Sequence, residues 1–182
     1  MEVEKLAPDN PLYPPALAGL SEPPELTFIG NQELLHQPLL AVFCSVKCPA
    51  SLILKAHDLA KELTVSGQAV ISGFQSPVEK EMLTVLLRGS GPIVVCPARG
   101  LADVRTPAAW RMPIETGRML LLSAFAADIK RADRANASHR NLLAASLAND
   151  ILIIHAEPGS KIEALYVRIQ ANGKTIKILT KF

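Results

Sequence analysis

Short apolar runs alternate with amphipathic stretches over most of the chain. The runs predict strands at Leu26–Ile29, Leu39–Cys44, Gln68–Ser72, Pro92–Cys96, Met119–Ser123, Ile151–His155 and Thr175–Thr180. The stretches carry apolar residues at steps of three and four, which is the period of one helix face. They predict helices at Pro49–Leu63, Val78–Leu87, Ser138–Ala148 and Ser160–Gln170.

Strands that are almost wholly apolar are usually buried on both faces, as in a parallel sheet covered by helices. Their alternation with helices predicts βαβ units with right-handed crossovers. We therefore expect an α/β fold, a three-layer Rossmann-like domain with a mostly parallel sheet covered by helices. The interval 97–117 contains three prolines, so we expect a loop there with one short helix around Trp110.

The length of 182 residues predicts one domain with a short lead-in. Residues 1–38 contain many of the 14 prolines, and we expect this proline-rich lead-in to pack on a Rossmann-like domain formed by residues 39–182. Apolar residues make up 49% of the chain, which is enough for a sizeable core. No apolar run approaches the ~18 residues of a membrane span, so we expect no membrane partner.

The N-terminal residues and the cysteine count predict a cytoplasmic location. The first five residues are acidic and lack the apolar stretch of a secretory signal. Three cysteines are an odd number, which argues against a disulfide framework. Cys44 and Cys48 are close in sequence, but Cys96 is distant and no histidine has ligand spacing, so we expect neither a metal site nor another cofactor.

Ligands of open α/β sheets bind beyond the carboxyl ends of the strands. The segments that follow the predicted strands carry small or hydroxyl-bearing residues at Ser45, Ser72-Gly73 and Gly159-Ser160. Backbone amides at such positions bind anions, which predicts a phosphate-bearing ligand. The GxGxxG and GxxxxGK[ST] patterns are both absent, which argues against an ordinary NAD enzyme and a P-loop NTPase.

An S-x-x-E pattern precedes two of the predicted helices, at 76–79 and 160–163. It is the pattern of a capping box, which by itself would explain both Glu79 and Glu163. A functional interpretation can coexist with it: Gly159 and Ser160 would contact a phosphate while one glutamate accepts from a ribose hydroxyl. The two glutamates are the only catalytic candidates.

Basic residues are concentrated in one part of the chain, although the net charge is only +2. Eight basic and four acidic residues lie between positions 99 and 140, and seven of the eight are arginines, which suit two-pronged phosphate contacts. The segment forms either a phosphate-binding surface or a solvated face of paired charges. The candidate surface residues are Arg99, Arg105, Arg111, Arg118, Arg131 and Arg134.

Several motifs occur in the order of the signatures of the DprA/Smf DNA-processing proteins. The segment from Tyr13 to Leu17 (Tyr-Pro-Pro-Ala-Leu) resembles the entry segment of that family. Ser72-Gly73, Arg140-Asn141 and Pro158-Gly159-Ser160 resemble its SG, RN and SG signatures, and the resemblance spans residues 11–180. Cys44-Ser45-Val46-Lys47 stands at the position of the family's G-S-R turn, without the glycine.

The resemblance implies an extended Rossmann-like fold, shared with the LOG-type nucleotide hydrolases. It also implies a domain that binds single-stranded DNA in a basic pocket, forms a homodimer and helps to load the recombinase RecA. The edge strand Thr175–Thr180 could then pair between subunits. The implied phosphate-binding residues are Ser45, Lys47, Ser72, Gly73, Arg140, Asn141, Gly159 and Ser160.

Three functions compete at this stage. The first is a non-enzymatic module that binds single-stranded DNA, and the second is a pocket that senses a small nucleotide or nucleotide derivative. The third is a LOG-like nucleotide N-glycosidase that would use Arg140 with Glu79 or Glu163. Paired carboxylates at a catalytic spacing are missing, so we expect binding rather than catalysis and leave the enzymatic question open.

Overall fold

The computed structural model describes residues 2–102, 104–171 and 174–179, and this part of the chain contains one eight-stranded sheet. The strands are β1 (Glu4–Leu6), β2 (Leu26–Gly30), β3 (Leu39–Cys44), β4 (Ala69–Ser72), β5 (Ile93–Val95), β6 (Met119–Ser123), β7 (Asp150–His155) and β8 (Ile176–Ile178). Their order in the sheet is β1-β2-β6-β5-β4-β3-β7-β8. The six strands β6, β5, β4, β3, β7 and β8 are mutually parallel. Strand β1 pairs antiparallel with β2, and β2 pairs antiparallel with β6.

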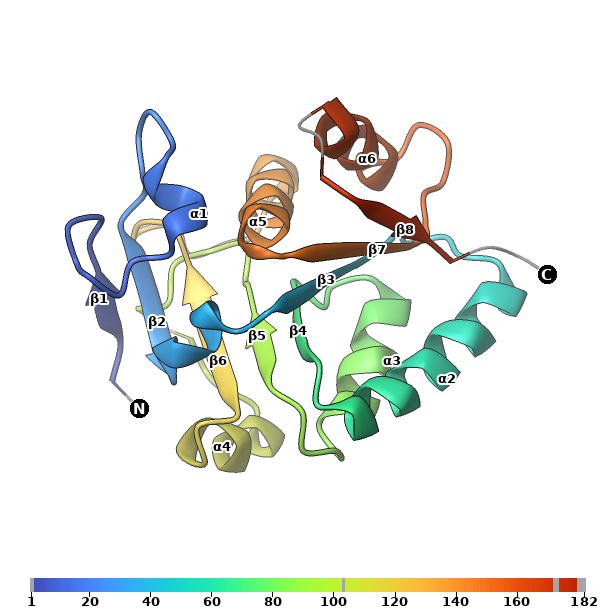
Figure 1. The fold of residues 1–182 in the computed structure, drawn as a ribbon, viewed down its shortest axis with the longest axis horizontal. Coiled ribbons are helices and arrows are strands. Elements are labelled where there is room, and N and C mark those ends of the chain that lie inside the picture. The colour runs from blue at the N-terminus through green and yellow to red at the C-terminus, as the bar shows by residue number, and fades with distance from the viewer. Residues whose placement is uncertain (1, 103, 172–173, 180–182) are drawn as a thin grey trace.

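Helices connect the strands and cover both faces of the sheet (Figure 1). They are α1 (Pro15–Ala18), α2 (Ala50–Ser66), α3 (Pro77–Leu86), α4 (Ala108–Glu115), α5 (Arg134–Leu147) and α6 (Lys161–Ala171), with a 3-10 helix η1 (Gln32–His36). In Figure 1, α1, α5 and α6 lie on one side of the sheet, and α2, α3 and α4 lie on the other. The three-layer α/β fold predicted from the sequence is confirmed.

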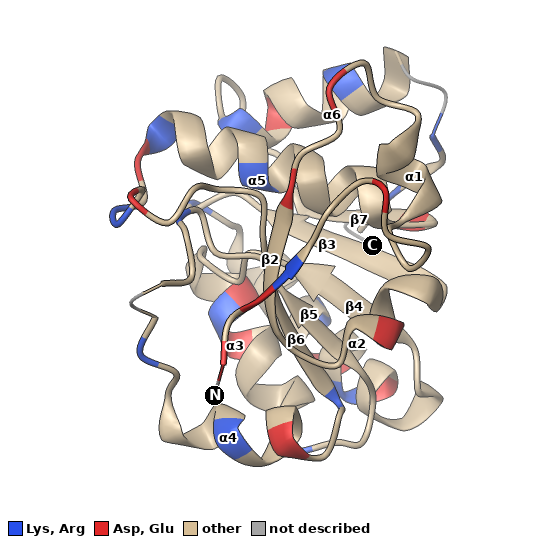
Figure 2. Cartoon of the chain, turned by 90° about the vertical axis from the view of Figure 1, so that its left-hand side faces the viewer, with Lys and Arg blue, Asp and Glu red and all other residues tan. Residues whose placement is uncertain are grey.

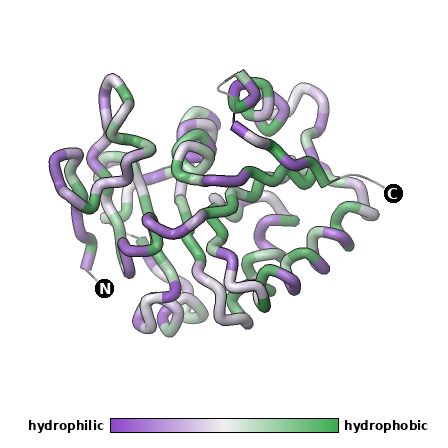
Figure 3. Tube along the Cα trace, viewed as in Figure 1, coloured by the Kyte–Doolittle hydropathy of each residue, from purple (hydrophilic) through white to green (hydrophobic). Residues whose placement is uncertain are grey.

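The hydrophobic core is divided by the sheet into two clusters. Neighbouring residues of one strand face opposite clusters, as Val70 and Ile71 of β4 do, and both are fully buried. Figure 3 shows the resulting apolar colouring of the central strands. Burial on both faces explains why these strands are continuous apolar runs rather than alternating patterns.

The proline-rich N-terminal segment is built into this sheet. Its strands β1 and β2 extend the sheet beyond β6, and its residues Leu6, Leu17 and Leu26 are at most 1% exposed within the core. The hydroxyl of Tyr13 donates to the carbonyl oxygen of Pro24 (2.7 Å) and so links the residues before α1 to those before β2. The N-terminal segment and the rest of the chain therefore form one hydrophobic core.

The strand order reverses at β3. From β3 the sheet grows in one direction through β4, β5 and β6, and then β7 pairs with the other side of β3. In open α/β sheets the crevice beyond such a reversal is the usual ligand site. The carboxyl ends of β3 and β7 are therefore the first place to look for function.

The differences from the predicted elements have local causes. Helix α5 begins at Arg134, about one turn before the predicted start, because the Asp133 side chain accepts a hydrogen bond from the N–H of Asn136 (2.8 Å). Helix α4 contains Trp110, as predicted. The predicted last strand is present as β8, but its predicted end at Thr180 lies outside the described residues.

The described residues contain neither a membrane-spanning helix nor a candidate metal site. Their helices are all too short or too polar to cross a membrane. They also contain no group of three histidine, cysteine or acidic side chains that could hold a metal ion. The three cysteines are free thiols.

Candidate functional site

A pocket of about 660 Å³ lies beyond the carboxyl ends of β3, β4 and β7, at the reversal of strand order. Its walls come from the turns after these strands and from the first turns of α5 and α6. Its lining residues include Ser45, Lys47, Gln75, Glu79, Arg134, Arg140, Asn141, Glu157, Gly159, Ser160 and Lys161. The topology thus brings together segments that are far apart in the sequence.

Two serine hydroxyls join the turns after β3 and β7. Ser45 Oγ and Ser160 Oγ are 2.9 Å apart, and the N–H of Glu157 donates to Ser45 Oγ (3.0 Å). The N–H of Ser45 donates to the carbonyl oxygen of His155 (2.9 Å), so the two turns are held by backbone and side-chain bonds. Hydroxyls in this arrangement can redirect a proton toward an anionic oxygen.

The turn before α6 is closed by a capping arrangement. Ser160 Oγ accepts from the N–H of Glu163 (3.2 Å), and the Glu163 carboxylate accepts from the N–H of Gly159 (2.7 Å). Gly159 has φ +74°, a left-handed conformation that glycine adopts without strain, and the space around its Cα is open. The capping role expected for Glu163 is confirmed, and its carboxylate holds the turn.

Glu79 binds three backbone amides on two elements. Its Oε1 accepts from the N–H of Cys44 (2.8 Å), and its Oε2 accepts from the N–H groups of Gln75 (2.9 Å) and Ser76 (3.3 Å). The capping box predicted at the start of α3 is present. Burial raises the pKa of Glu79, and the three amides and the Arg140 charge oppose the rise. These bonds show a structural role for a side chain that the sequence left open as a catalytic candidate.

Arg140 is the most deeply buried cation of the pocket wall, with 4% of its surface exposed. Its Nη1 donates to the carbonyl oxygen of Cys96 (3.0 Å), and its Nη2 makes a long contact of 3.5 Å with Gln75 Oε1. Within the described residues its Nε has no hydrogen-bond partner, and no carboxylate lies within ion-pair distance. Burial lowers the pKa of Arg140, and the charge of Glu79 opposes the fall. The site therefore holds a buried cation with unused donor capacity.

Gly73 makes room for this arginine. A Cβ atom built on Gly73 would overlap the guanidinium of Arg140, so a larger residue here would displace that guanidinium. The hydroxyl of the preceding residue, Ser72, accepts from the N–H of Phe74 (3.2 Å) and shapes the same turn. Ser72 and Gly73 thus lie behind the pocket wall and position the cation that lines it.

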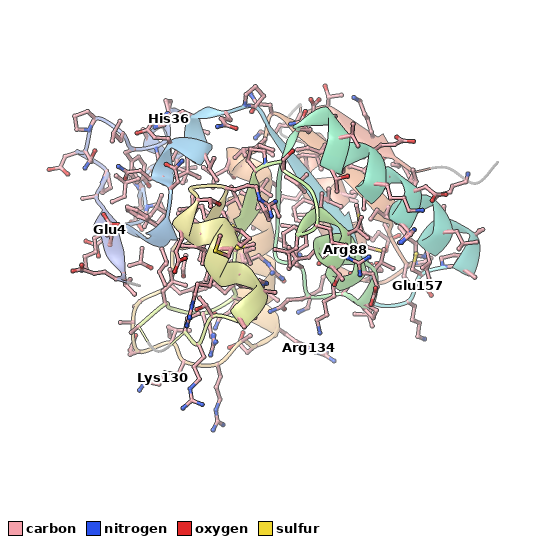
Figure 4. All side chains as sticks on the ribbon, turned by 90° about the horizontal axis from the view of Figure 1, so that it is seen from below. Glu4, His36, Arg88, Lys130, Arg134 and Glu157 are labelled. Carbon is pink, nitrogen blue, oxygen red and sulfur yellow. The ribbon has the colours of Figure 1, made fainter. Side chains whose placement is uncertain are left out.

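The rim of the pocket carries further positive charge. Lys47, Arg134 and Lys161 line it, and Lys161 Nζ donates to the carbonyl oxygen of Arg134 (2.7 Å). Partial burial and then the charge of Arg134 lower the pKa of Lys161. Figure 2 shows basic residues on α5 and on the loop before it, and Figure 4 shows the Arg134 side chain at the edge of the molecule. The lining contains four cations and two carboxylates, Glu79 and Glu157.

Six of the eight residues predicted to bind phosphate line the pocket together. They are Ser45, Lys47, Arg140, Asn141, Gly159 and Ser160, while Ser72 and Gly73 support Arg140 from behind. The predicted surface arginines are more scattered. Arg134 lines the pocket, Arg99 and Arg105 line a separate groove, and Arg111 and Arg131 are exposed on α4 and on the loop before α5.

Arg118 differs from the other arginines. It precedes β6 at the amino end of the sheet, opposite the pocket, and donates to the carbonyl oxygens of Leu86, Leu87 and Gly91 (2.9–3.3 Å). The structure does not bring it to the other predicted surface residues. Its guanidinium instead hydrogen-bonds the carbonyl oxygens at the C-terminal end of α3 and just after it.

Sequence reasoning did not select three lining residues, Gln75, Glu157 and Lys161. Each is one or two residues from a predicted site residue and lies in a segment that the sequence already singled out. Their polarity alone carried no signal, because polar residues are common in every turn of the chain.

The fold is similar to solved structures of DNA processing protein A. The protein from Streptococcus pneumoniae has a TM-score of 0.79 at 19% identity, over 97% of this chain and 62% of that one. This chain therefore spans less than two thirds of that protein. The protein from Helicobacter pylori, whose structure was described for its single-stranded DNA binding mode, has a TM-score of 0.78 at 22% identity, over 100% of this chain and 82% of that one.

A more distant likeness is to the molybdenum cofactor binding protein from Rippkaea orientalis. Its TM-score is 0.54 at 10% identity, over 78% of this chain and 76% of that one. Likeness at such low identity, here and to the two proteins above, shows a shared fold and nothing about the ligand.

The comparison with family sequence profiles is more specific than the comparison of folds. The profile of the family described as DNA recombination-mediator protein A matches residues 4–176, which is nearly the whole chain. No curated protein sequence matches significantly. The SG, RN and SG segments that led to the same family from the sequence lie together around one pocket. The chain belongs to the DNA recombination-mediator protein A family.

Proposed function

We propose that this protein binds single-stranded DNA and holds a backbone phosphate in the pocket at the carboxyl ends of β3, β4 and β7. The observation that carries the proposal is Arg140, a buried guanidinium that lines the pocket without an ion-pair partner among the described residues. A buried charge is costly unless it is paired, and a phosphate oxygen would supply the missing partner.

The surroundings of Arg140 support a phosphate rather than a cation or an apolar ligand. Hydroxyls of Ser45 and Ser160 and the first turn of α6 lie in the same pocket, and helix N-termini attract anions. Lys47, Arg134 and Lys161 surround the entrance with exposed charge. Family membership and the description of the H. pylori relative point to single-stranded DNA as the source of the phosphate.

The proposal is tested by fluorescence anisotropy with a labelled oligothymidylate at several salt concentrations. We expect binding that weakens steeply with salt, because each neutralised phosphate releases counterions. Arg140→Ala should weaken binding roughly tenfold or more, because hydrogen bonds to charged groups are strong. It should also reduce the log–log salt slope by about one. Thermal melts of each variant verify that it remains folded.

A second pair of substitutions, at Gly159, tests the same pocket in case the Arg140 variant does not fold. Gly159→Asp adds a negative charge at the pocket, and Gly159→Asn is its neutral match, since both residues tolerate a left-handed backbone. We expect the Asp variant to bind more weakly than the Asn variant, with the difference shrinking at high salt. Equal affinity of the two would place the phosphate elsewhere. Salt-insensitive binding of a mononucleotide, without strand binding, would instead favour a small-nucleotide sensor.

We propose in addition a cytoplasmic location and a homodimer. The three free cysteines, of which Cys44 and Cys96 are buried, fit a reducing compartment. The strand β8 has a neighbour only on its β7 side among the described residues, and Ile178 on it is 50% exposed. Such an edge is a template for pairing with a second copy.

A further inference from the structure

A second groove, of about 730 Å³, lies between α3 and α4 on the opposite side of the turn after β4. Its wall is largely apolar and includes Phe74, Leu83, Val95 and the ring of Trp110. Trp110 packs partly against the core, and the rest of its surface is exposed in the groove. The function proposed above leaves this groove unused.

The groove adjoins the phosphate pocket across the turn after β4. Gln75 lines both, and Gly73, which lies against Arg140 of the pocket wall, also lines the groove. Phe74 between them has φ +48°, a left-handed conformation that is rare for a bulky residue. Strain of this kind persists where the surrounding structure requires it. Here the strained residue lies in the short turn that borders both cavities.

The charge of the groove is one-sided. Its described lining residues include the cations Lys80, Arg99 and Arg105 and no carboxylate. None of the three forms an ion pair with a described residue. Arg99 makes one long, exposed contact, from its Nη1 to the carbonyl oxygen of Lys130 (3.4 Å). An apolar floor with an aromatic ring and a basic rim suits a ligand that has both flat apolar faces and phosphates.

We propose that this groove binds the nucleotides next to the phosphate held at Arg140, with one base stacked on Trp110 and the neighbouring phosphates on Lys80, Arg99 and Arg105. The inference rests on the function proposed above and extends the path of the strand from the β3–β7 pocket past Gln75 to α4. It requires an unpaired strand, since a base inside a duplex cannot reach the indole face.

Trp110 is the only tryptophan of the chain, so fluorescence excited selectively at tryptophan reports on this groove alone. We expect an oligothymidylate to quench that fluorescence over the same concentration range in which its anisotropy rises. An abasic strand of equal length carries the phosphates without the bases, and it should bind more weakly and leave the fluorescence nearly unchanged.

The variants are Trp110→Ala, Trp110→Phe and, as a matched control on the same helix, Met112→Ala. Met112 is 64% exposed and does not line the groove. We expect Trp110→Ala to weaken oligothymidylate binding roughly 5- to 100-fold, the range for one lost stacking contact. Trp110→Phe should keep most of the affinity, Met112→Ala should keep all of it, and none of the three should affect the abasic strand.

The failure of this inference is distinguishable from the failure of the proposed function. Oligothymidylate binding that depends on Arg140 but leaves Trp110 fluorescence and the Trp110→Ala affinity unchanged would overturn the groove and leave the pocket intact. No binding of either strand at low salt would overturn both.

Discussion

At the scale of single residues, the presence of glycine at position 73 is explained by the packing of Arg140 against it. The guanidinium lies where a side chain of residue 73 would have to be, so a glycine after β4 and an arginine in α5 form one structural unit. The backbone φ of Gly73 does not require glycine; the close approach of Arg140 does. The Ser72-Gly73 and Arg140-Asn141 motifs, each weak evidence by itself, therefore belong to one packing arrangement.

Gly73→Ala should weaken oligonucleotide binding to about the extent of Arg140→Ala, because the added methyl displaces the guanidinium. It should also lower the free energy of unfolding by about 1–3 kcal/mol, the usual cost of overpacking. Gly19→Ala is the control, since a Cβ there meets no atom within 4 Å. The decisive measurement is the double variant: adding Gly73→Ala to Arg140→Ala should cost little further affinity. Additive losses would show that the two residues act separately.

Several site residues could be predicted individually, but not how they contact one another. Arg140, Asn141 and Ser160 were found from the order of short motifs along the chain. The burial of Arg140 and its unpaired Nε depend on the position of α5 over the turn after β4, and local sequence does not encode that packing.

At the scale of elements, Glu79 joins a helix to a strand. A capping box needs the glutamate only at the start of its own helix, α3. Here the other carboxylate oxygen reaches the N–H of Cys44 at the end of β3, so one side chain holds together two segments that border the pocket. Glu163 at α6 has the simpler role, because its carboxylate bonds only within its own turn.

Glu79→Ala should lower the free energy of unfolding by about 2–4 kcal/mol, because it leaves the buried backbone amides of Cys44 and Ser76 without their acceptor. The matched substitution Glu163→Ala should cost only about 1 kcal/mol or less, since the exposed amide of Gly159 can bind water instead. Urea denaturation of the two variants and the unmodified protein measures the difference. Equal destabilisation would mean that the bond from Glu79 to β3 contributes nothing beyond capping.

The elements that could be predicted best from the sequence are those buried on both faces. The central strands are apolar runs because layers of helices cover them, and the expected ranges of β3 and β6 agree with the observed ones. Strand β1 was not predicted, since of its three residues only Leu6 is buried and no periodicity can be seen. The early start of α5 depends on a single Asp133 cap inside a polar stretch.

At the scale of the whole molecule, the sheet has two edges of different origin. The N-terminal segment forms one edge with β1, and β8 forms the other (Figure 1). The sequence predicted parallel βαβ units, but it could not predict that β2 would pair antiparallel with β6, because pairing across such a distance leaves no local pattern. Both edges flank the strands that carry the pocket, so assembly through either one would bring two pockets into one particle.

The proposed homodimer makes a prediction about β8. If two copies pair along this edge, light scattering should give twice the 19.6 kDa chain mass, and Ile178→Lys should return the protein to the single mass by placing a charge on the edge. Val65→Lys replaces an equally apolar, 88% exposed residue on α2 and should leave the dimer intact. A single-chain mass at every concentration would refute the dimer.

The same variant connects assembly to binding. Two pockets on one particle raise the effective concentration of the second contact once the first has formed. Ile178→Lys should therefore weaken binding of an oligonucleotide long enough to reach both pockets, while binding of a strand that fits one pocket stays unchanged. A uniform loss for both lengths would instead mean that the substitution damages the pocket itself, because β8 pairs with β7, whose carboxyl end forms one wall.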